Sequence, residues 1–276
     1  MLAAMASSTN HTAHAADGTA LAVTVTGAGP PLLMIPGLGS ARRVYDPIVP
    51  FIAERCQVIV YDPRGIGMSG ITDGPWDMHL LADDAVHVLD QVGVDRAAVF
   101  GASMGGMVAQ QVAIDHPERV ARLILAATHP GGVSMVRPDP HNLSRLMGRG
   151  ATTPGDAYRI ACTVLYGEVF RRQHPDFIER QVAERARHPV RARAFTNQAQ
   201  AVAGHDAYQD LGGLHMPTLV MHGSLDQVSP EGNAHVLSGR IPGAQVLLFE
   251  DHGHLFFHEV PEESARVIAD FVTSGS

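Results

Sequence analysis

The stretch Gly101-Ala102-Ser103-Met104-Gly105-Gly106 separates two contrasting patterns in the chain. Before it, Ala97–Phe100 is a short apolar run of the kind that forms a buried strand. After it, Met104–Asp115 carries apolar residues at helical spacing. Glycines flank the serine, where larger side chains would clash as a strand and a helix approach each other. The stretch therefore predicts a serine held at a sharp strand-to-helix turn.

Short apolar runs alternate with helical patterns on both sides of this turn. The predicted strands are Leu21–Thr26, Leu32–Ile35, Val58–Tyr61, Ala97–Phe100, Leu123–Ala126, Thr218–Met221 and Val246–Phe249. The predicted helices are Asp77–Val92, Met104–Asp115, Glu231–Ser238 and Glu262–Thr273. Most of the apolar runs are bounded by Gly, Pro or Asp, as is typical of strands buried on both faces. This order predicts an α/β fold with a mostly parallel central sheet flanked by helices.

The alternation stops between about Arg137 and Leu211, where helical patterns follow one another without a convincing strand. We expect a helical cap inserted into the fold, formed by residues 133–211, and a core domain formed by residues 1–132 and 212–276. Ligands of open α/β sheets bind at the carboxyl ends of the strands, and the insertion leaves the sheet there. The cap is therefore expected to roof the binding site.

Charge is distributed unevenly over the chain. Residues 137–210 hold 11 Arg and 8 acidic residues, whereas the rest of the chain holds 9 Arg and 20 acidic residues. A basic cap on an acidic body could attract an anionic substrate or an acidic partner. The alternative, which we favour, is a set of solvated helix faces with intrahelical pairs such as Glu184 with Arg187.

Composition excludes several kinds of chemistry. Every basic residue among the 20 is Arg, so no lysine is available for a Schiff base, a Ser-Lys dyad or a Walker-type phosphate loop. Cys56 and Cys162 are too few for a four-cysteine zinc site or a disulfide framework, and no H-E-x-x-H motif occurs. We therefore predict no metal and no cofactor. The formal net charge of -8 argues against nucleic acid as a partner.

The N-terminal residues Met1–Asn10 are small and polar without a basic residue, and no run of about 18 apolar residues occurs anywhere. These features predict neither a signal peptide nor a membrane span, and we expect a cytoplasmic protein. The sequence leaves the oligomeric state open, a homo-oligomer included.

A serine hydroxyl near neutral pH needs a base within hydrogen-bond reach and an acid that orients the base. For a serine at this kind of turn, the expected order along the chain is serine, acid, histidine. Asp226 follows the strand Thr218–Met221, and His254 follows the strand Val246–Phe249. His252 is a second candidate for the base, and Glu250 and Asp251 are further candidates for the acid.

The chain resembles the α/β-hydrolase superfamily over nearly its whole length. The residues that carry the resemblance are Pro36–Ser40, Tyr61–Ser69, Gly101–Gly105, His222–Asp226, and Gly253-His254 followed by Glu259 and Pro261. The resemblance implies that Ser103 is the nucleophile, Asp226 the acid and His254 the base. Within the superfamily the chain is similar to esterases, enol-lactonases and cofactor-free haloperoxidases. It also resembles esterases of polyketide products, partly through Ala126–Gly132.

An oxyanion hole follows from the same chemistry, because attack on a carbonyl leaves negative charge on its oxygen. Met104, which follows the nucleophile at a helix N-terminus, is expected to supply one backbone N–H. The resemblance assigns the second N–H to Leu38. The sequence departs from the family in having Pro36 where the family has a histidine, which affects the support of this loop and not its donors.

The stretch Asp62–Ser69 is a further signature of the family. We interpret it as a structural turn tied down by Asp62 and Arg64, and an Arg64 that binds a substrate carboxylate is the less favoured alternative. The spacing of its glycines does not match a nucleotide-binding loop.

The resemblance also bears on the reaction, since dehalogenases and epoxide hydrolases of this fold need Asp where this chain has Ser103. We expect acyl transfer from a carboxylic ester, lactone or thioester. Met104, Met107, Met135 and Met147 suggest a pocket for a bulky apolar acyl substrate, with core packing as the alternative. A lyase, cyclase or acyltransferase of a biosynthetic pathway of polyketide type remains an alternative function, and a ligand-binding module with little turnover is a less favoured one.

Overall fold

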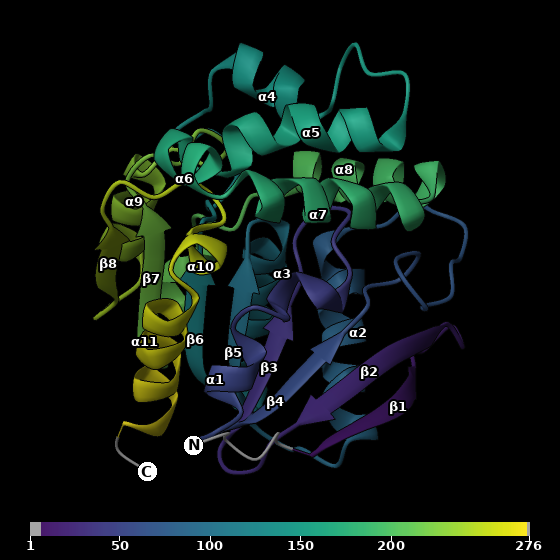
Figure 1. The fold of residues 1–276 in the computed structure, drawn as a ribbon. Helices are drawn as coiled ribbons and strands as arrows, with labels where there is room; N and C mark the ends of the chain where they lie inside the picture. The colour runs from purple at the N-terminus through teal and green to yellow at the C-terminus, as the bar shows by residue number, and fades with distance from the viewer. Residues whose placement is uncertain (1–6, 275–276) are drawn as a thin grey trace, which may run out of the picture.

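The structure, a computed structural model, describes residues 7–274, which form an eight-stranded sheet with the order β1-β2-β4-β3-β5-β6-β7-β8 (Figure 1). Its strands are β1 Ser8–His14, β2 Ala20–Thr26, β3 Pro31–Ile35, β4 Gln57–Tyr61, β5 Ala97–Ala102, β6 Val120–Ala126, β7 Thr218–Gly223 and β8 Gln245–Phe249. Strand β2 pairs antiparallel with β1 and β4, and every other pairing is parallel. The predicted α/β fold with a mostly parallel sheet is confirmed.

The described residues contain eleven α-helices. They are α1 Val49–Ile52, α2 Met78–Gln91, α3 Met104–Asp115, α4 Pro140–Leu146, α5 Pro154–Leu165, α6 Glu168–Gln173, α7 Pro175–Arg187, α8 Ala192–Gly204, α9 Gly232–Arg240, α10 Phe256–Glu259 and α11 Pro261–Thr273. Three short 3-10 helices are η1 Arg42–Tyr45, η2 Pro117–Arg119 and η3 Asp210–Gly213.

Each central strand is buried on both faces because its side chains alternate between two apolar clusters. In β3, Leu33 and Ile35 face the cluster that contains α2 and α3, whereas Leu32 and Met34 face the cluster that contains α11. The same alternation in β5 places Val99 on the first face. This is the physical reason that these strands appear in the sequence as uninterrupted apolar runs.

All seven predicted strands are present, with ends that differ by a few residues, and the four predicted helices correspond to α2, α3, α9 and α11. The strand β1 was not predicted. It is an edge strand that exposes six of its seven residues, burying only Ala13, so it carries no apolar alternation that sequence could reveal. It is held by antiparallel pairing with β2 from Ser8↔Thr26 to His14↔Ala20.

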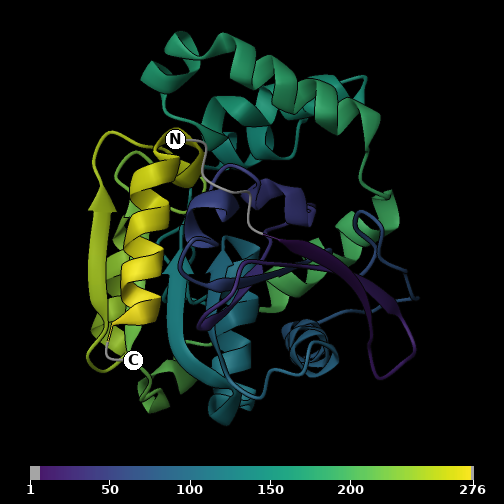
Figure 2. The same cartoon turned by 60° about the horizontal axis from the view of Figure 1, so that its bottom comes forward.

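The helices α4 to α8, called the inserted helices below, follow β6 and precede β7. They lie together beyond the carboxyl ends of the parallel strands, at the top of Figure 1, and Figure 2 shows them on the same side of the sheet. The loops that follow β3, β5, β7 and β8 begin at this side of the molecule. This arrangement brings four sequence motifs to the edge of the sheet that the inserted helices face, namely Pro36–Ser40, Gly101–Gly105, His222–Asp226 and Gly253-His254.

None of the helices in residues 7–274 is long and apolar enough to cross a membrane. The prediction that Met1–Asn10 is not a signal peptide falls partly on residues 1–6, which lie outside the described residues.

Candidate active site

Ser103 lies between the last residue of β5 and the first residue of α3, with a φ of 57°, in the left-handed region. A non-glycine residue in this region is strained by about 1–3 kcal/mol, so the surrounding contacts must hold it there. The Ser103 N–H donates to Ala126 O at 2.9 Å, and the Ser103 carbonyl accepts from Thr128 Oγ1 at 2.8 Å. Both partners belong to β6 and its loop, which therefore fix the turn.

The glycines around Ser103 permit a close approach of three elements. A Cβ atom on Gly105 would lie 2.0 Å from Ile35 O, and one on Gly101 would lie 2.1 Å from Gly105 O. Neither distance is physically attainable, so α3 can begin against β3 and β5 only with glycine at both positions. The glycines on either side of Ser103 are thus required by the close approach of strand and helix that the sequence predicts.

The loop after β3 lies beside the nucleophile candidate. A Cβ built on Gly37 would lie 3.3 Å from Ser103 Cβ. Within residues 7–274, neither Leu38 N–H nor Met104 N–H makes a backbone hydrogen bond. The two amides expected to form the oxyanion hole are therefore unoccupied donors on the two segments that meet at Ser103.

Asp226 and His254 form a buried pair. His254 Nδ1 lies 2.7 Å from Asp226 Oδ2, and the two residues are 3% and 6% exposed. The other carboxylate oxygen, Oδ1, accepts from the backbone N–H groups of Val228 and Ser229 at 2.8 and 2.9 Å. The carboxylate is thus held on both oxygens, one of which faces the imidazole.

The electrostatic environment keeps this carboxylate ionised. Burial alone would raise the pKa of Asp226, but the neighbouring His254 and His222 imidazoles outweigh burial and hold that pKa well below its usual range. His222 Nε2 lies 2.6 Å from Ser229 O and 3.3 Å from Asp226 Oδ2. Because Ser229 O can only accept, Nε2 of His222 carries the proton and supports the carboxylate as a second donor.

The loops that carry the acid and the base are tied together. Leu225 N–H donates to His252 O at 2.9 Å, and Ser224 N–H donates to Phe249 O at 3.0 Å. A Cβ on Gly223 would lie 2.2 Å from Gly253 O. The separation between Asp226 and His254 is therefore set by backbone contacts between the ends of β7 and β8.

The alternative site candidates lie differently. His252 Nδ1 lies 3.0 Å from Oε2 of Glu259, whose side chain is 1% exposed. His252 therefore pairs with Glu259 and not with an acid on the loop after β7. Glu250 and Asp251 are exposed. The geometry thus brings Asp226 to His254 and leaves the other three residues outside this pair.

Ser103 and His254 reach the same sheet edge from β5 and β8, yet no hydrogen bond joins them within the described residues. Such contacts are often long before substrate binds. Nδ1 of His254 is engaged by Asp226, which leaves Nε2 as the ring atom available to a hydroxyl.

His129 is a further residue of this region, one that no sequence pattern predicts. Its Nδ1 accepts from Gly131 N–H at 3.1 Å, so Nε2 carries the proton of the neutral ring. Burial, with a smaller contribution from the neighbouring His254, lowers the pKa of His129 to about 4. The stretch Ala126–Gly132 resembles esterases of polyketide products, but nothing in the sequence shows that His129 lies near His254.

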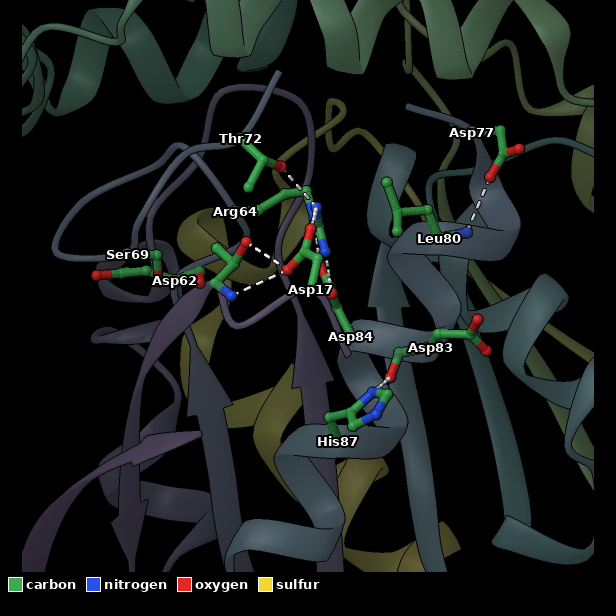
Figure 3. Close-up of polar contacts among 11 residues, drawn as sticks. Asp17, Asp62, Arg64, Ser69, Thr72, Asp77, Leu80, Asp83, Asp84 and His87 are labelled. Atoms are coloured by element: carbon green, nitrogen blue, oxygen red, sulfur yellow. Dashed lines mark hydrogen bonds and ion pairs between the residues drawn. The ribbon is translucent and has the colours of Figure 1, made fainter. Parts of the chain in front are cut away.

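The Asp62–Ser69 stretch is a structural turn, as interpreted from the sequence (Figure 3). Arg64, 1% exposed, donates twice to Asp84, at 2.6 and 2.5 Å, and also to Asp17 at 2.8 Å. Asp62 accepts from Met68 N–H at 2.9 Å. Since these contacts occupy its guanidinium, Arg64 is not available to bind a substrate carboxylate.

The arginines of the inserted helices are largely engaged by neighbours. Arg187 lies 3.2 Å from Glu184, the pair that the sequence predicted, and Arg172 lies 3.3 Å from Glu168. Arg171 donates to Tyr166 O. These contacts support solvated helix faces over a surface that collects anions.

The methionines divide between the core and the surface. Met104 and Met107 are buried among α2, α3 and the sheet, where they pack the core. Met147, after α4, is 40% exposed. For the first two, core packing rather than a substrate pocket is their role in the fold.

Comparison with known proteins places the chain in a family. The family model for the alpha/beta hydrolase fold matches residues 30–261, and the chain belongs to this family. A poly(3-hydroxyalkanoate) depolymerase of Ectopseudomonas oleovorans is 34% identical over 243 residues, covering 88% of this chain and 84% of that protein. A pimeloyl-acyl-carrier-protein methyl ester esterase of Aeromonas hydrophila is 28% identical over 255 residues, covering 89% and 96%.

Solved structures agree with this assignment. A thermophilic esterase from Thermogutta terrifontis superimposes with a TM-score of 0.81 at 28% identity, covering 97% of this chain and 98% of that one. The resemblance stated from the sequence is confirmed, and the protein is an enzyme of the α/β-hydrolase superfamily whose relatives are hydrolases.

Proposed function

We propose that the protein is a serine hydrolase that cleaves a carboxylic ester, lactone or thioester through an acyl-enzyme on Ser103. The observation that carries the proposal is the buried contact of 2.7 Å between Asp226 and His254 Nδ1, at the sheet edge where Ser103 stands in a left-handed turn. A carboxylate on Nδ1 fixes the tautomer in which Nε2 is the base.

In the first half of the proposed reaction, Ser103 Oγ attacks the carbonyl carbon while His254 Nε2 takes the hydroxyl proton. The carbonyl oxygen gains negative charge, and the N–H groups of Leu38 and Met104 donate to it. Each such donor is worth about 3–4 kcal/mol in the transition state. The bond to the leaving alcohol or thiol then breaks, and His254 returns the proton to that group.

Water completes the cycle. His254 Nε2 takes a proton from a water molecule, whose oxygen attacks the acyl carbon on Ser103. The bond to Oγ breaks, Oγ recovers the proton, and the carboxylic acid leaves. Throughout, Asp226 stays ionised and stabilises the imidazolium, in keeping with its depressed pKa.

We propose an apolar aliphatic acyl substrate. Exposed apolar side chains follow the carboxyl ends of β6 and β7, namely Val133 at 93% and Leu225 at 48% exposure. Apolar side chains are the predominant lining of small-molecule sites. The relative that is named a poly(3-hydroxyalkanoate) depolymerase makes esters of 3-hydroxyalkanoic acids the first compounds to test.

We further propose that residues 133–211 form a cap over this site and that residues 1–132 and 212–276 form the core domain. Supporting contacts join the two parts close to the site: Leu255 N–H donates to Leu165 O at 2.9 Å, and Gly167 N–H donates to Glu259 Oε1 at 2.9 Å. The cap would then limit which acyl groups reach Ser103.

A fluorophosphonate probe tests the proposal. The wild type is expected to gain one adduct, mapped to Ser103, and Ser103→Ala is expected to gain none. Ser8→Ala, which alters an exposed serine of the edge strand β1, is the matched control and should label like the wild type. A wild type that does not react, or a Ser103→Ala variant that labels equally, contradicts the assignment.

A panel of substrates tests the reaction class. Aliphatic methyl esters, 3-hydroxyacyl esters, ring lactones and thioesters are compared, and we expect turnover of at least one ester series that disappears in Ser103→Ala. Labelling of Ser103 without turnover of any member would instead favour a lyase, cyclase or acyltransferase.

A further inference from the structure

The peptide groups on both sides of Gly39 are held by the inserted helices. Gly39 N–H donates to Gln198 Oε1 at 2.8 Å, and Arg185 Nη1 donates to Gly39 O at 2.7 Å. Gln198 belongs to α8 and Arg185 to α7. Two helices that lie far from Gly39 in the sequence thus form hydrogen bonds with this residue of the loop that follows β3.

Side chains also pack against Gly39. A Cβ built on Gly39 would lie 3.2 Å from the Phe195 ring and 3.5 Å from Val190 Cγ2, so both side chains lie directly against the loop. Gly39 has a φ of 63°. A side chain there would be both strained and crowded by the inserted helices.

The core contacts the same loop through packing, and the loop also closes on itself. Ser40 N–H donates to Gly37 O at 3.1 Å, which closes a turn within the loop itself. Gly37 packs against Ser103, and Leu38 packs partly into the core. Among the described residues, the hydrogen bonds that anchor Gly39 to another part of the molecule come from α7 and α8.

Gln198 is fully buried, and its amide orientation follows from its partner. Since Gly39 N–H is a donor, the atom that faces it must be Oε1. Its Nε2 has no hydrogen-bond partner within the described residues. A buried amide with an unpaired donor lowers the stability of the fold. If Gln198 served packing alone, an apolar side chain would be more stable at this position.

We propose that Gln198 and Arg185 are positioning residues that set the geometry of the oxyanion hole from the cap. The Leu38–Gly39 peptide adjoins the Leu38 N–H donor, so a rotation of the Gly39 peptides moves that donor. Gln198 fixes one peptide and Arg185 fixes the next. This inference rests on the proposed function, because it assigns Leu38 N–H to the oxyanion.

The test compares Gln198→Met with Gln200→Met. Both changes remove an amide from α8, but Gln200 is exposed and serves as the matched control. We expect Gln198→Met to lower kcat about 10- to 100-fold with KM within about threefold of the wild type, because misplacing a donor weakens transition-state binding alone. Gln200→Met should match the wild type.

An alkylboronic acid supplies a second readout. Its tetrahedral adduct on Ser103 places an oxygen in the hole, so its affinity should fall by the same factor as kcat/KM, while the affinity for the product carboxylic acid should not. Arg185→Met is expected to give the same pattern. It stands in if Gln198→Met does not fold, which circular dichroism and thermal unfolding establish.

Several outcomes overturn the inference. One is a kcat within about threefold of the wild type in both Gln198→Met and Arg185→Met, and another is an equal loss of affinity for the boronic acid and the product acid. These outcomes, with Ser103 still labelled by the fluorophosphonate, leave the proposed function standing. A wild type that neither labels nor turns over ends the proposed function and this inference together.

Discussion

The contacts of Asp226 offset the free-energy cost of burying its charge. It is buried, which disfavours a charge, yet it accepts two backbone hydrogen bonds and faces two imidazoles. Hydrogen bonds to an ionised acceptor are the stronger kind, so this set stabilises the carboxylate where a neutral acid would gain little. The resulting fixed charge is what His254 requires if it is to become an imidazolium during a reaction.

Asp226→Asn should lower kcat by about 10³- to 10⁴-fold, because the amide removes the charge and favours the wrong tautomer of His254. Steady-state hydrolysis of an ester from the panel measures the change. Asp251→Asn, at an exposed acid three residues before His254, is the control and should keep nearly full activity.

At this scale the sequence predicts where some residues lie in the fold and misses the contacts of others. Ser103, Asp226 and His254 could be placed because each follows a recognisable strand in the expected order. Gln198, Arg185 and His129 could not, because their positions near these residues depend on contacts between segments far apart in the chain. A hydrogen bond between Gln198 and Gly39 spans 159 residues, and no local pattern encodes it.

Among the elements, the turn from β5 to α3 depends on the absence of side chains. Gly105→Ala should lower the free energy of unfolding by at least about 2 kcal/mol, since its Cβ would meet Ile35 O at 2.0 Å. Urea unfolding measures this. At Gly204, at the end of α8, a Cβ meets no atom within 4 Å, so Gly204→Ala should be nearly neutral; equal losses in both variants contradict the account.

A second element, the turn after β4, depends on a buried ion pair. Arg64→Met should lower the free energy of unfolding by about 3–5 kcal/mol, because it leaves the Asp84 carboxylate buried without its partner. The double variant Arg64→Met/Asp84→Leu should recover much of this loss. Arg55→Met breaks an exposed pair with Asp270 and should cost less than about 1 kcal/mol.

The elements themselves were predictable to different degrees. Strands buried on both faces, such as β5 and β6, have the uninterrupted apolar runs that sequence reveals. The edge strand β1 lacks such a run because six of its seven residues are exposed, and it is held by antiparallel pairing with β2. The inserted segment could be predicted as helical, whereas the bounds of α4 to α8 depend on packing within the folded molecule.

For the molecule as a whole, buried neutral histidines predict acid sensitivity. Burial lowers the pKa values of His129, His205 and His258 to about 4, against 6.5 when exposed. Unfolding therefore takes up protons between pH 6.5 and 4, so the free energy of unfolding should fall as pH falls through this window. Urea unfolding at a series of pH values checks the direction.

His258 offers a specific variant for this effect. Its Nε2 donates to Val44 O at 2.6 Å, and in the neutral ring, which burial favours, its Nδ1 accepts from the Tyr166 hydroxyl at 2.9 Å. His258→Gln should reduce the slope of stability against pH by up to about 1.4 kcal/mol per pH unit. The exposed His235→Gln should leave the slope unchanged, and an unchanged slope in His258→Gln contradicts the assignment.

The central claim is an acyl group on Ser103, and rapid acid quench followed by peptide mass spectrometry measures it directly. During turnover of an activated aliphatic ester, we expect the peptide that contains Ser103 to gain the mass of the acyl group, within a burst of alcohol release that matches the enzyme concentration. Hydrolysis of the same ester with no acylated peptide, or with the acyl group on another residue, contradicts the account.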